Sequence, residues 1–282
     1  MNNFQFENRK LLIVSMHQKE RVIAPLLEKH LGVKCITISS LNTDLLGTFS
    51  GEIERESDPL TTAKRKCLMG MEMANCDLAV ANEGSFGPHP SLFFIPADDE
   101  LMLFYDKRNQ LEITARELST HTNFNGAEIK SKKELFDFAT LVNFPSHGLI
   151  LKKSKHSYTE MVKGIRTMDH LEQTFEQFSS KSGSVWLETD MRALHNPTRM
   201  SVIETATKKL IEKVNTYCPN CKSPGFGITK YTYGLPCKLC NFPTKSALSS
   251  LSECSLCHHV KEDNYPLNKT FEDPMHCDNC NP

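Results

Sequence analysis

The sequence predicts an α/β protein with a mixed sheet and flanking helices, followed by a small cysteine-rich zinc-ribbon tail. Strand-length apolar stretches alternate with helical patterns over residues 10–116. Eight of the 11 cysteines form four C-x-x-C pairs after residue 217. The chain has 282 residues, of which 39% are hydrophobic and 24% charged, and this composition is typical of globular proteins.

Strand and helix patterns alternate along the first part of the chain. A buried strand at residues 11–15 leads into helical spacing that ends at Gly32, and a second strand follows at residues 34–39. Such a strand–helix–strand succession usually gives parallel pairing. Further strands are expected at residues 78–81, 92–96, 100–106 and 111–116, the last three antiparallel. We therefore expect a mixed sheet.

Two helices begin with the same signal. Asp58 and Asn196 each precede a proline, and a capping side chain followed by proline is typical of a helix N-terminus. Between them, the pattern predicts helices near residues 131–141 and 168–178 and strands near residues 147–151 and 185–187. We expect an α/β domain over residues 1–217 and leave open whether it is subdivided near residues 116–130.

The tail carries the clearest motif. Its four C-x-x-C pairs are Cys218 and Cys221, Cys237 and Cys240, Cys254 and Cys257, and Cys277 and Cys280. The first two pairs are separated by 15 residues and the last two by 19. Both separations match the spacing of four-thiolate zinc sites. Pairing in chain order predicts zinc ribbons at residues 218–250 and 251–282. Interleaved pairing, first with third and second with fourth, is the alternative.

The expected zinc ions are structural, because four thiolates fill the coordination shell. His258, His259 and His276 flank the second site and are alternative ligands there. Disulfides need an oxidising compartment, and no secretory leader is recognisable in the sequence. Iron–sulfur clusters use tighter spacings, and a thioredoxin-type centre needs one pair rather than four.

Charge and hydropathy narrow the range of partners. The chain has 33 basic and 34 acidic residues, a net charge of −1, and the six lysines and six acids of the tail cancel. The basic footprint of nucleic-acid binding is missing, which disfavours DNA or RNA as a partner. No apolar run is long enough to cross a bilayer, and we expect a cytoplasmic protein without a membrane partner. A protein partner that docks on the zinc tail is an alternative.

Polar side chains gather at three places where predicted strands end, which is where open α/β sheets bind ligands. Residues 15–20 offer His17 and Lys19 at a helix start, a setting that favours phosphate. Residues 82–90 include glycines that allow a ligand to approach the backbone. The polar candidates of this second cluster and of the third, at residues 188–199, are Glu83, Ser85, His89, Glu188, Asp190, Arg192, Asn196 and Arg199.

Each cluster has a functional and a structural interpretation. Glu83 would hold Mg²⁺ or act as a base, and Glu188 and Asp190 would supply a second pair of carboxylates that binds a metal ion. Arg192 and Arg199 would clamp phosphate beside a helix start. The structural alternatives are a solvated turn, a Gly/Pro turn and a surface salt-bridge network. The acids of the loop at residues 42–58, Glu52, Glu54 and Asp58, are further candidate metal ligands.

Several motifs resemble known families. They are Gly47-Thr48, Asp58-Pro59, Thr62-Ala63-Lys64, residues 77–87, 188–193 and 196–200, and Cys218-Pro219-Asn220-Cys221. Over about residues 10–245 they are similar to an uncharacterised bacterial family known only as a domain of unknown function. Residues 10–116 are faintly similar in layout to the inosine/xanthosine triphosphatase fold. That resemblance implies that Lys19 holds phosphate, Glu83 holds Mg²⁺ and Lys64 faces the nucleotide.

Two functions are compatible with these observations. The first is a Mg²⁺-dependent nucleotide phosphohydrolase, in which Glu83 and either Glu188 or Asp190 hold the metal while basic side chains clamp the phosphates. The second is a non-enzymatic zinc-ribbon adaptor that binds a nucleotide or a partner protein. A serine esterase or zinc protease has no motif in this chain.

Overall fold

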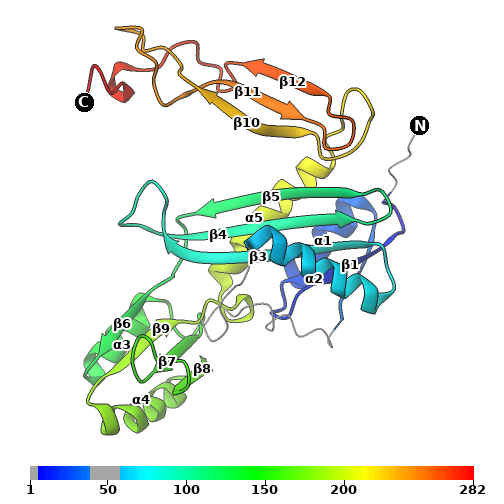
Figure 1. Cartoon of the computed structure of the whole chain (residues 1–282). Coiled ribbons are helices and arrows are strands. Elements are labelled where there is room, and N and C mark those ends of the chain that lie inside the picture. Colours follow the sequence, from blue (N-terminus) through cyan, green and yellow to red (C-terminus); the bar gives the residue numbers. More distant parts are fainter. Residues whose placement is uncertain (1–5, 39–57) are drawn as a thin grey trace. The chain divides into compact units, whose positions relative to one another are not determined.

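A mixed five-stranded sheet, in the order β2-β1-β3-β4-β5, organises the N-terminal part of the computed structural model (Figure 1). β1 (Lys10–Val14) pairs in parallel with β2 (Lys34–Ile36) and β3 (Leu78–Pro88). β4 (Pro96–Asp106) and β5 (Leu111–Ser119) extend the sheet in antiparallel fashion. The predicted mixed sheet is confirmed. The structure describes residues 6–38 and 58–282, so the loop acids Glu52 and Glu54 lie outside the described residues.

Helices cover both faces of this sheet. Because β2 and β3 lie on opposite sides of β1, right-handed crossovers place α1 (Glu20–Leu31) and α2 (Pro59–Ala74) on opposite faces, as Figure 1 shows. The α2 face buries Ala63, Cys67 and Met71 of the helix against apolar side chains of β1, β3 and β4. The predicted N-cap of α2 is confirmed, because Asp58 accepts hydrogen bonds from the backbone N–H groups of Leu60 and Thr61.

The long β3–β4 hairpin differs from the prediction. The sequence predicts a turn at residues 82–90 and a strand at 92–96, but β3 runs on to Pro88 and every residue from Leu78 to Pro88 pairs with β4. The polar residues of β3 stay in the sheet because β4 and neighbouring side chains satisfy them there. The connection at residues 89–95 leaves the apolar side chains of Phe93 and Phe94 76% and 85% exposed.

A second sheet, in the order β6-β9-β7-β8, follows in the chain. Its strands are antiparallel and comprise β6 (Gly126–Ile129), β7 (Leu149–Lys152), β8 (Met161–Ile165) and β9 (Val185–Thr189). The helices α3 (Lys132–Leu141) and α4 (Met168–Ser182) share one apolar core with these strands. Alternation along β9 buries Val185, Leu187 and Thr189 and leaves Trp186 and Glu188 partly exposed.

The described chain divides into two compact units, one formed by Phe6–Ile211 and the other containing Glu212–Pro282. The helix α5 (Pro197–Val214) ends at the start of the second unit. In that unit β10 (Gly227–Tyr233), β11 (Ala247–Glu253) and β12 (Val260–Asn264) form an antiparallel sheet in chain order. None of the helices among residues 6–38 and 58–282 is both long and apolar enough to span a membrane.

Candidate metal centres and a buried ionic cluster

Each C-x-x-C pair forms the same tight turn. The backbone N–H of the residue after the second cysteine donates to the carbonyl oxygen of the first, over 2.8–3.0 Å in all four pairs. That following residue has a positive φ in the first three turns, at Lys222, Asn241 and His258. Backbone N–H groups of Leu239 and Leu256 also approach the sulfurs of Cys237 and Cys254. Such turns bring two sulfurs to one side, as a zinc site requires.

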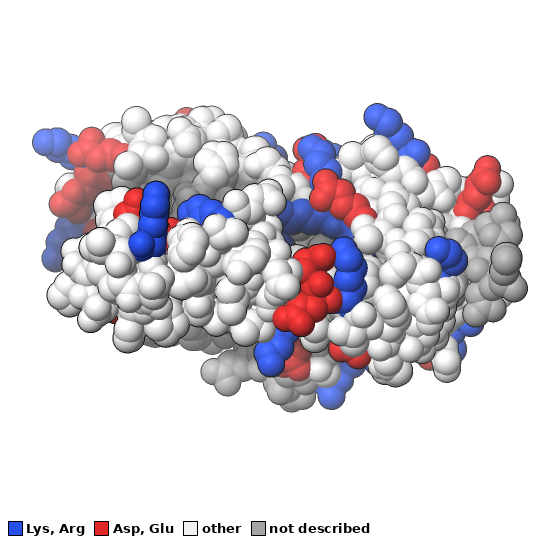
Figure 2. Space-filling model, turned by 90° about the horizontal axis from the view of Figure 1, so that it is seen from above, with Lys and Arg blue, Asp and Glu red and all other residues white. Residues whose placement is uncertain are grey.

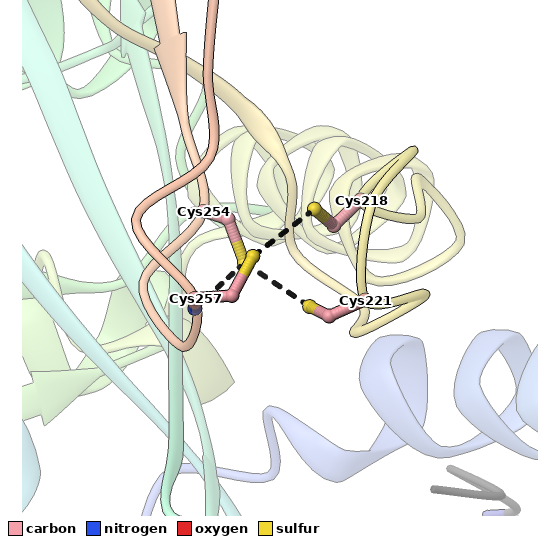
Figure 3. A group of neighbouring side chains, drawn as sticks. All are labelled: Cys218, Cys221, Cys254 and Cys257. Atoms are coloured by element: carbon pink, nitrogen blue, oxygen red, sulfur yellow. Dashed lines mark hydrogen bonds between the residues drawn. The ribbon is translucent and has the colours of Figure 1, made fainter. Parts of the chain in front are cut away.

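The eight cysteines form two groups of four, and the grouping is interleaved. Cys218 and Cys221 meet Cys254 and Cys257, with Sγ–Sγ distances of 3.6 and 3.7 Å. Figure 3 shows these four side chains pointing toward one another from two separate loops. The second group consists of Cys237, Cys240, Cys277 and Cys280, with Sγ–Sγ distances of 3.7 and 3.9 Å. Pairing in chain order, and with it the ribbons at residues 218–250 and 251–282, is therefore wrong.

The antiparallel sheet explains the interleaving. Pairing of Gly227 with Glu253 brings the chain before β10 to the end of β11, where Cys254 follows. At the other end of β10, Cys237 pairs in parallel with Glu272, close in sequence to the last cysteine turn. Each group therefore closes one end of the three-stranded sheet, and neither can form from consecutive pairs alone.

Both groups fit zinc. Four sulfurs held about 2.3 Å from a zinc ion lie about 3.8 Å apart, which agrees with the separations in both groups. His258, His259 and His276 belong to neither group, so the ligand sets are thiolates only. Four thiolates leave no position for substrate, and we assign a structural rather than catalytic role to such zinc ions.

In the first unit, four charged side chains and one amide side chain from separate segments converge near the N-terminus of α5. We call Lys19, Asn82, Asp98, Glu100 and Arg199 the buried ionic cluster; each is at most 5% exposed. Lys19 comes from the β1–α1 loop, Asn82 from β3, Asp98 and Glu100 from β4, and Arg199 from α5. Ionisable groups are rarely buried unless they are paired, so this concentration is a candidate site.

Arg199 and Glu100 form the centre of the buried ionic cluster. The Arg199 Nε donates to Glu100 Oε1 over 2.7 Å, and Nη1 donates to the backbone oxygen of Met191 over 2.6 Å. Asn82 Nδ2 donates to Glu100 Oε2 over 2.9 Å. Burial opposes ionisation of Glu100, but the charges of Arg199 and Lys19 hold its pKa below the ordinary value. Glu100 is therefore ionised and paired with a buried guanidinium.

Lys19 and Asp98 have strongly shifted pKa values. Lys19 Nζ donates to the backbone oxygen of Asn82 over 3.1 Å, and burial together with the charge of Arg199 lowers the Lys19 pKa to about 7. Burial and the charge of Glu100 raise the pKa of Asp98 to about 8. Strong shifts of this kind, produced by burial and specific charges, are typical of functional sites.

His17, Asp190 and Arg192 lie next to the cluster. Burial, followed by the charges of Lys19, Arg199 and Arg192, lowers the pKa of His17 to about 3. Asp190 is fully buried and accepts hydrogen bonds from the side chain of Arg192 and from the backbone N–H of Gly164. The predicted first and third polar clusters therefore do meet, around His17.

Most of this chain matches the model of one protein family. Residues 66–282 match DUF6671, a domain of unknown function. The chain belongs to this family. The match spans β3, β4, α5 and all eight tail cysteines, and it begins after the segment that carries His17 and Lys19. A search of curated proteins finds none that matches the chain.

In this DUF6671 chain the three predicted catalytic carboxylates are each bonded to a cation. Glu83 lies on the α2 face and pairs with Lys66 over 2.5 Å. Glu188 pairs with Lys152 over 2.6 Å and accepts from the indole of Trp186, whereas Asp190 holds Arg192. Within the described residues, only the two cysteine groups bring three or more potential ligands within 4.8 Å. Glu83, Glu188 and Asp190 therefore do not gather into one metal site.

Other predicted residues have local partners. Lys64 pairs with Glu112 and lies over the ring of Tyr105, on the α2 face. Ser85 is exposed, and His89 Nδ1 accepts from two backbone N–H groups of its own turn. Asn196 caps α5 as predicted, because its Oδ1 accepts from the backbone N–H of Arg199 over 2.9 Å. These contacts favour the structural interpretation of Lys64, His89 and Asn196.

Sequence reasoning missed Asp98 and Glu100. The sequence predicts a strand at residues 100–106, and neither acid was among the candidate site residues. The available signal was alternation: residues 98, 100, 102 and 104 share one face of β4, and Met102 and Phe104 are core side chains. Two acids in register with two core residues indicate a buried polar site.

Proposed function

We propose that the first unit binds a phosphate-bearing ligand, a nucleotide, beside the buried ionic cluster and hydrolyses it, while the second unit is held together by structural zinc. The observation that carries the proposal is the convergence of three cations. Arg199 is bonded to Glu100, Lys19 to the backbone of Asn82, which also holds Glu100, and Arg192 to the adjoining Asp190. Burial and then the charges of these cations lower the pKa of His17 between them. Three cations from separate segments around one point are a common way to hold phosphate oxygens.

The local charge balance favours an anion. Glu100 and Asp190 supply two negative charges against the guanidinium groups of Arg192 and Arg199. Asp98, with a pKa of about 8, is mostly neutral at pH 7, and Lys19 adds a positive charge when it is protonated. The site therefore carries a surplus of positive charge, and a phosphate group would complete it.

The proposed reaction is hydrolysis of a phosphoanhydride bond. A water oxygen attacks phosphorus, the bond to the leaving phosphate oxygen breaks, and the proton of the attacking water passes to a phosphate oxygen of the products or to solvent. Lys19, Arg192 and Arg199 stabilise the charge on the equatorial and leaving oxygens. Mg²⁺, where it binds with the nucleotide, supplies further charge neutralisation.

The first test is stabilisation of the zinc-loaded chain by nucleoside triphosphates, with and without Mg²⁺, followed by an assay for released phosphate. Ligands that bind the native state raise its thermal midpoint. We expect nucleotides to raise the thermal midpoint of the native chain. Lys19→Met should weaken nucleotide affinity at least tenfold, since the substitution removes one cation from the site. Lys64→Gln is the matched control, because Lys64 is bonded to Glu112 instead.

A second candidate function is that of a zinc-ribbon adaptor. Apolar side chains of the second unit are well exposed, with Leu239 at 73% and Tyr233 and Met275 at 64% each. Such side chains are typical of protein-docking surfaces. Nucleic acid is a weaker candidate, because basic and acidic side chains are interspersed on the face seen in Figure 2 without a continuous basic area. Stabilisation by nucleotides without phosphate release would favour the adaptor.

A further inference from the structure

Asp98 and Glu100 form a pair of buried carboxylates that the reaction proposed above does not use. They are two residues apart in β4, so both side chains lie on the same face of the sheet. Each is 0% exposed. In the β3–β4 register they stand opposite Phe86 and Gly84. Two carboxylates buried side by side repel each other unless a positive charge lies between them.

The two carboxylates are unequally bonded. Glu100 accepts from Arg199 and Asn82, which leaves lone pairs on both of its oxygens. Both oxygens of Asp98 are buried, and no amide, hydroxyl or cationic donor of the described residues reaches them. Asp98 instead faces the Glu100 carboxyl, with which its neutral form shares a hydrogen bond. The ionised form of Asp98 is costly in this setting, and a cation between the two carboxylates would supply the missing partner.

Gly84 allows the Glu100 carboxylate and the Arg199 guanidinium to lie directly against the backbone of β3. A Cβ at this position would lie 2.6 Å from Glu100 Oε1 and 2.5 Å from Arg199 Nη2, closer than any side-chain carbon can stand. The absence of a side chain on β3 is therefore required for the carboxylate to sit against the backbone. The glycine therefore helps to fix the position of the Glu100 carboxylate.

We propose that Asp98 and Glu100 are the protein ligands of a divalent cation, Mg²⁺ or Mn²⁺. Magnesium in phosphoryl-transfer sites is bound by one or two carboxylates, and substrate phosphates and water fill the remaining positions. This inference rests on the proposed function in one respect, because a bound phosphate would complete the coordination. It replaces Glu83 as the metal ligand, since Glu83 lies on the opposite, α2 face of the sheet, where it pairs with Lys66.

Charge makes the cation and the anion cooperative. Arg199 lies on Glu100, and Lys19 is close enough for its pKa to respond to the Glu100 charge. These cations oppose a bare metal ion, whereas a phosphate group between them and the metal attracts both. We therefore expect Mn²⁺ to bind more tightly when inorganic phosphate is present, and phosphate to bind more tightly when Mn²⁺ is present, by the same factor.

The test is a titration of the zinc-loaded full chain with Mn²⁺, in which the electron paramagnetic resonance signal of free Mn²⁺ reports binding. The expected result is one Mn²⁺ per chain. Asp98→Asn, which keeps the shape of the side chain, should weaken binding at least tenfold. Asp99→Asn is the matched control, because Asp99 is the neighbouring acid and pairs with Arg116 instead.

Several outcomes overturn the inference. Absence of Mn²⁺ binding by the native chain, with or without phosphate, means that Asp98 and Glu100 share only a proton. Unchanged binding by a folded Asp98→Asn variant, or loss of binding in Glu83→Gln, places the metal elsewhere. The fluorescence of Trp186, the single tryptophan of the chain, reports in each variant whether the first unit is folded.

The two proposals fail separately. Stabilisation of the chain by phosphate or a nucleotide, without Mn²⁺ binding, leaves the proposed function standing and removes the metal site. Mn²⁺ binding that depends on Asp98, without stabilisation by any phosphate compound, leaves the metal site and removes nucleotide hydrolysis.

Discussion

Arg199 is the largest side chain that the described part of the chain buries completely, and its contacts explain why a guanidinium is needed there. It bonds Glu100 and the Met191 backbone and lies over the ring of Phe86, with Cζ 5.1 Å from the ring centroid. A planar group with donors on three sides can satisfy these partners together, which a lysine ammonium cannot. The sequence predicts Arg199 as a phosphate clamp, and in the structure its Nε and Nη1 are bonded to Glu100 and to the Met191 backbone, which fixes the guanidinium in place.

At the same scale, Lys19 predicts how anion binding depends on pH. The Lys19 pKa is about 7 in the folded chain, so the ammonium loses its proton between about pH 6 and pH 8. An anion binds the charged form more tightly. Affinity should therefore fall as pH rises, by at most about tenfold per pH unit above 7. Sulfate is the suitable probe, because its own charge is constant in this range.

Binding of sulfate is measured by its stabilisation of the chain at pH 6.0, 7.0 and 8.0. His17, with a pKa of about 3, is neutral throughout and contributes no change. Asp98, with a pKa of about 8, is about half ionised at pH 8, and its negative charge acts in the same direction as the loss of the Lys19 proton. Lys19→Met should bind sulfate weakly with a much flatter profile below pH 7.5. Affinity that rises with pH would contradict the role of Lys19.

Among the elements, α5 shows how a local signal positions a site. Asn196 caps the helix through the backbone N–H of Arg199, and its Nδ2 donates to Asn123 Oδ1 over 2.8 Å. The cap therefore fixes where α5 begins. Arg199, three residues after Asn196, is thereby positioned to donate a hydrogen bond to Glu100. The sequence predicted this helix start from the Asn-Pro pair alone, because capping is a short-range interaction.

Removing that cap should destabilise the first unit. Asn196→Ala loses the cap, at about 1 kcal/mol, and the hydrogen bond to Asn123, at about 1 kcal/mol more. Asn196→Ser restores a capping oxygen and should recover about half of the loss. Urea unfolding followed by Trp186 fluorescence measures both variants. Equal stabilities of the Ala and Ser variants would show that Asn196 does not act as a cap.

β3 is the element that a local signal misread. Its polar residues after Ala81, with glycine and proline, are typical of a turn. In the structure the partners of Asn82 and Glu83 come from β4, from Lys19 and from Lys66 of α2, which are distant in the chain. A short stretch of sequence does not show partners that are distant in the chain. The sequence therefore predicts Lys19 and Arg199 as site residues but not Asp98 and Glu100.

At the scale of the whole molecule, the eight cysteines form two interleaved groups, and each group lies at one end of the same three-stranded sheet. Consecutive and interleaved pairing use the same residues, so zinc content alone does not separate them. Double substitutions do. Cys218→Ser with Cys257→Ser removes two ligands from one observed group, whereas Cys218→Ser with Cys240→Ser removes one ligand from each.

We expect the first double variant to retain about one zinc ion per chain with unchanged affinity, because Cys237, Cys240, Cys277 and Cys280 stay intact. The second should lose high-affinity zinc at both sites, since three thiolates bind zinc much more weakly than four. Metal content after dialysis against a chelator measures this. Pairing in chain order would give the reverse result.

Local sequence is enough to predict the alternation of strands and helices, the caps at Asp58 and Asn196, and the eight thiolates that suit zinc. These features depend on neighbouring residues, on side-chain type or on a turn of four residues. Tertiary structure decided which cysteines share a site, because the antiparallel sheet joins segments more than 30 residues apart. It also decided that Glu100, rather than Glu83, faces Arg199, because the two faces of a strand alternate and only the packed helices distinguish them.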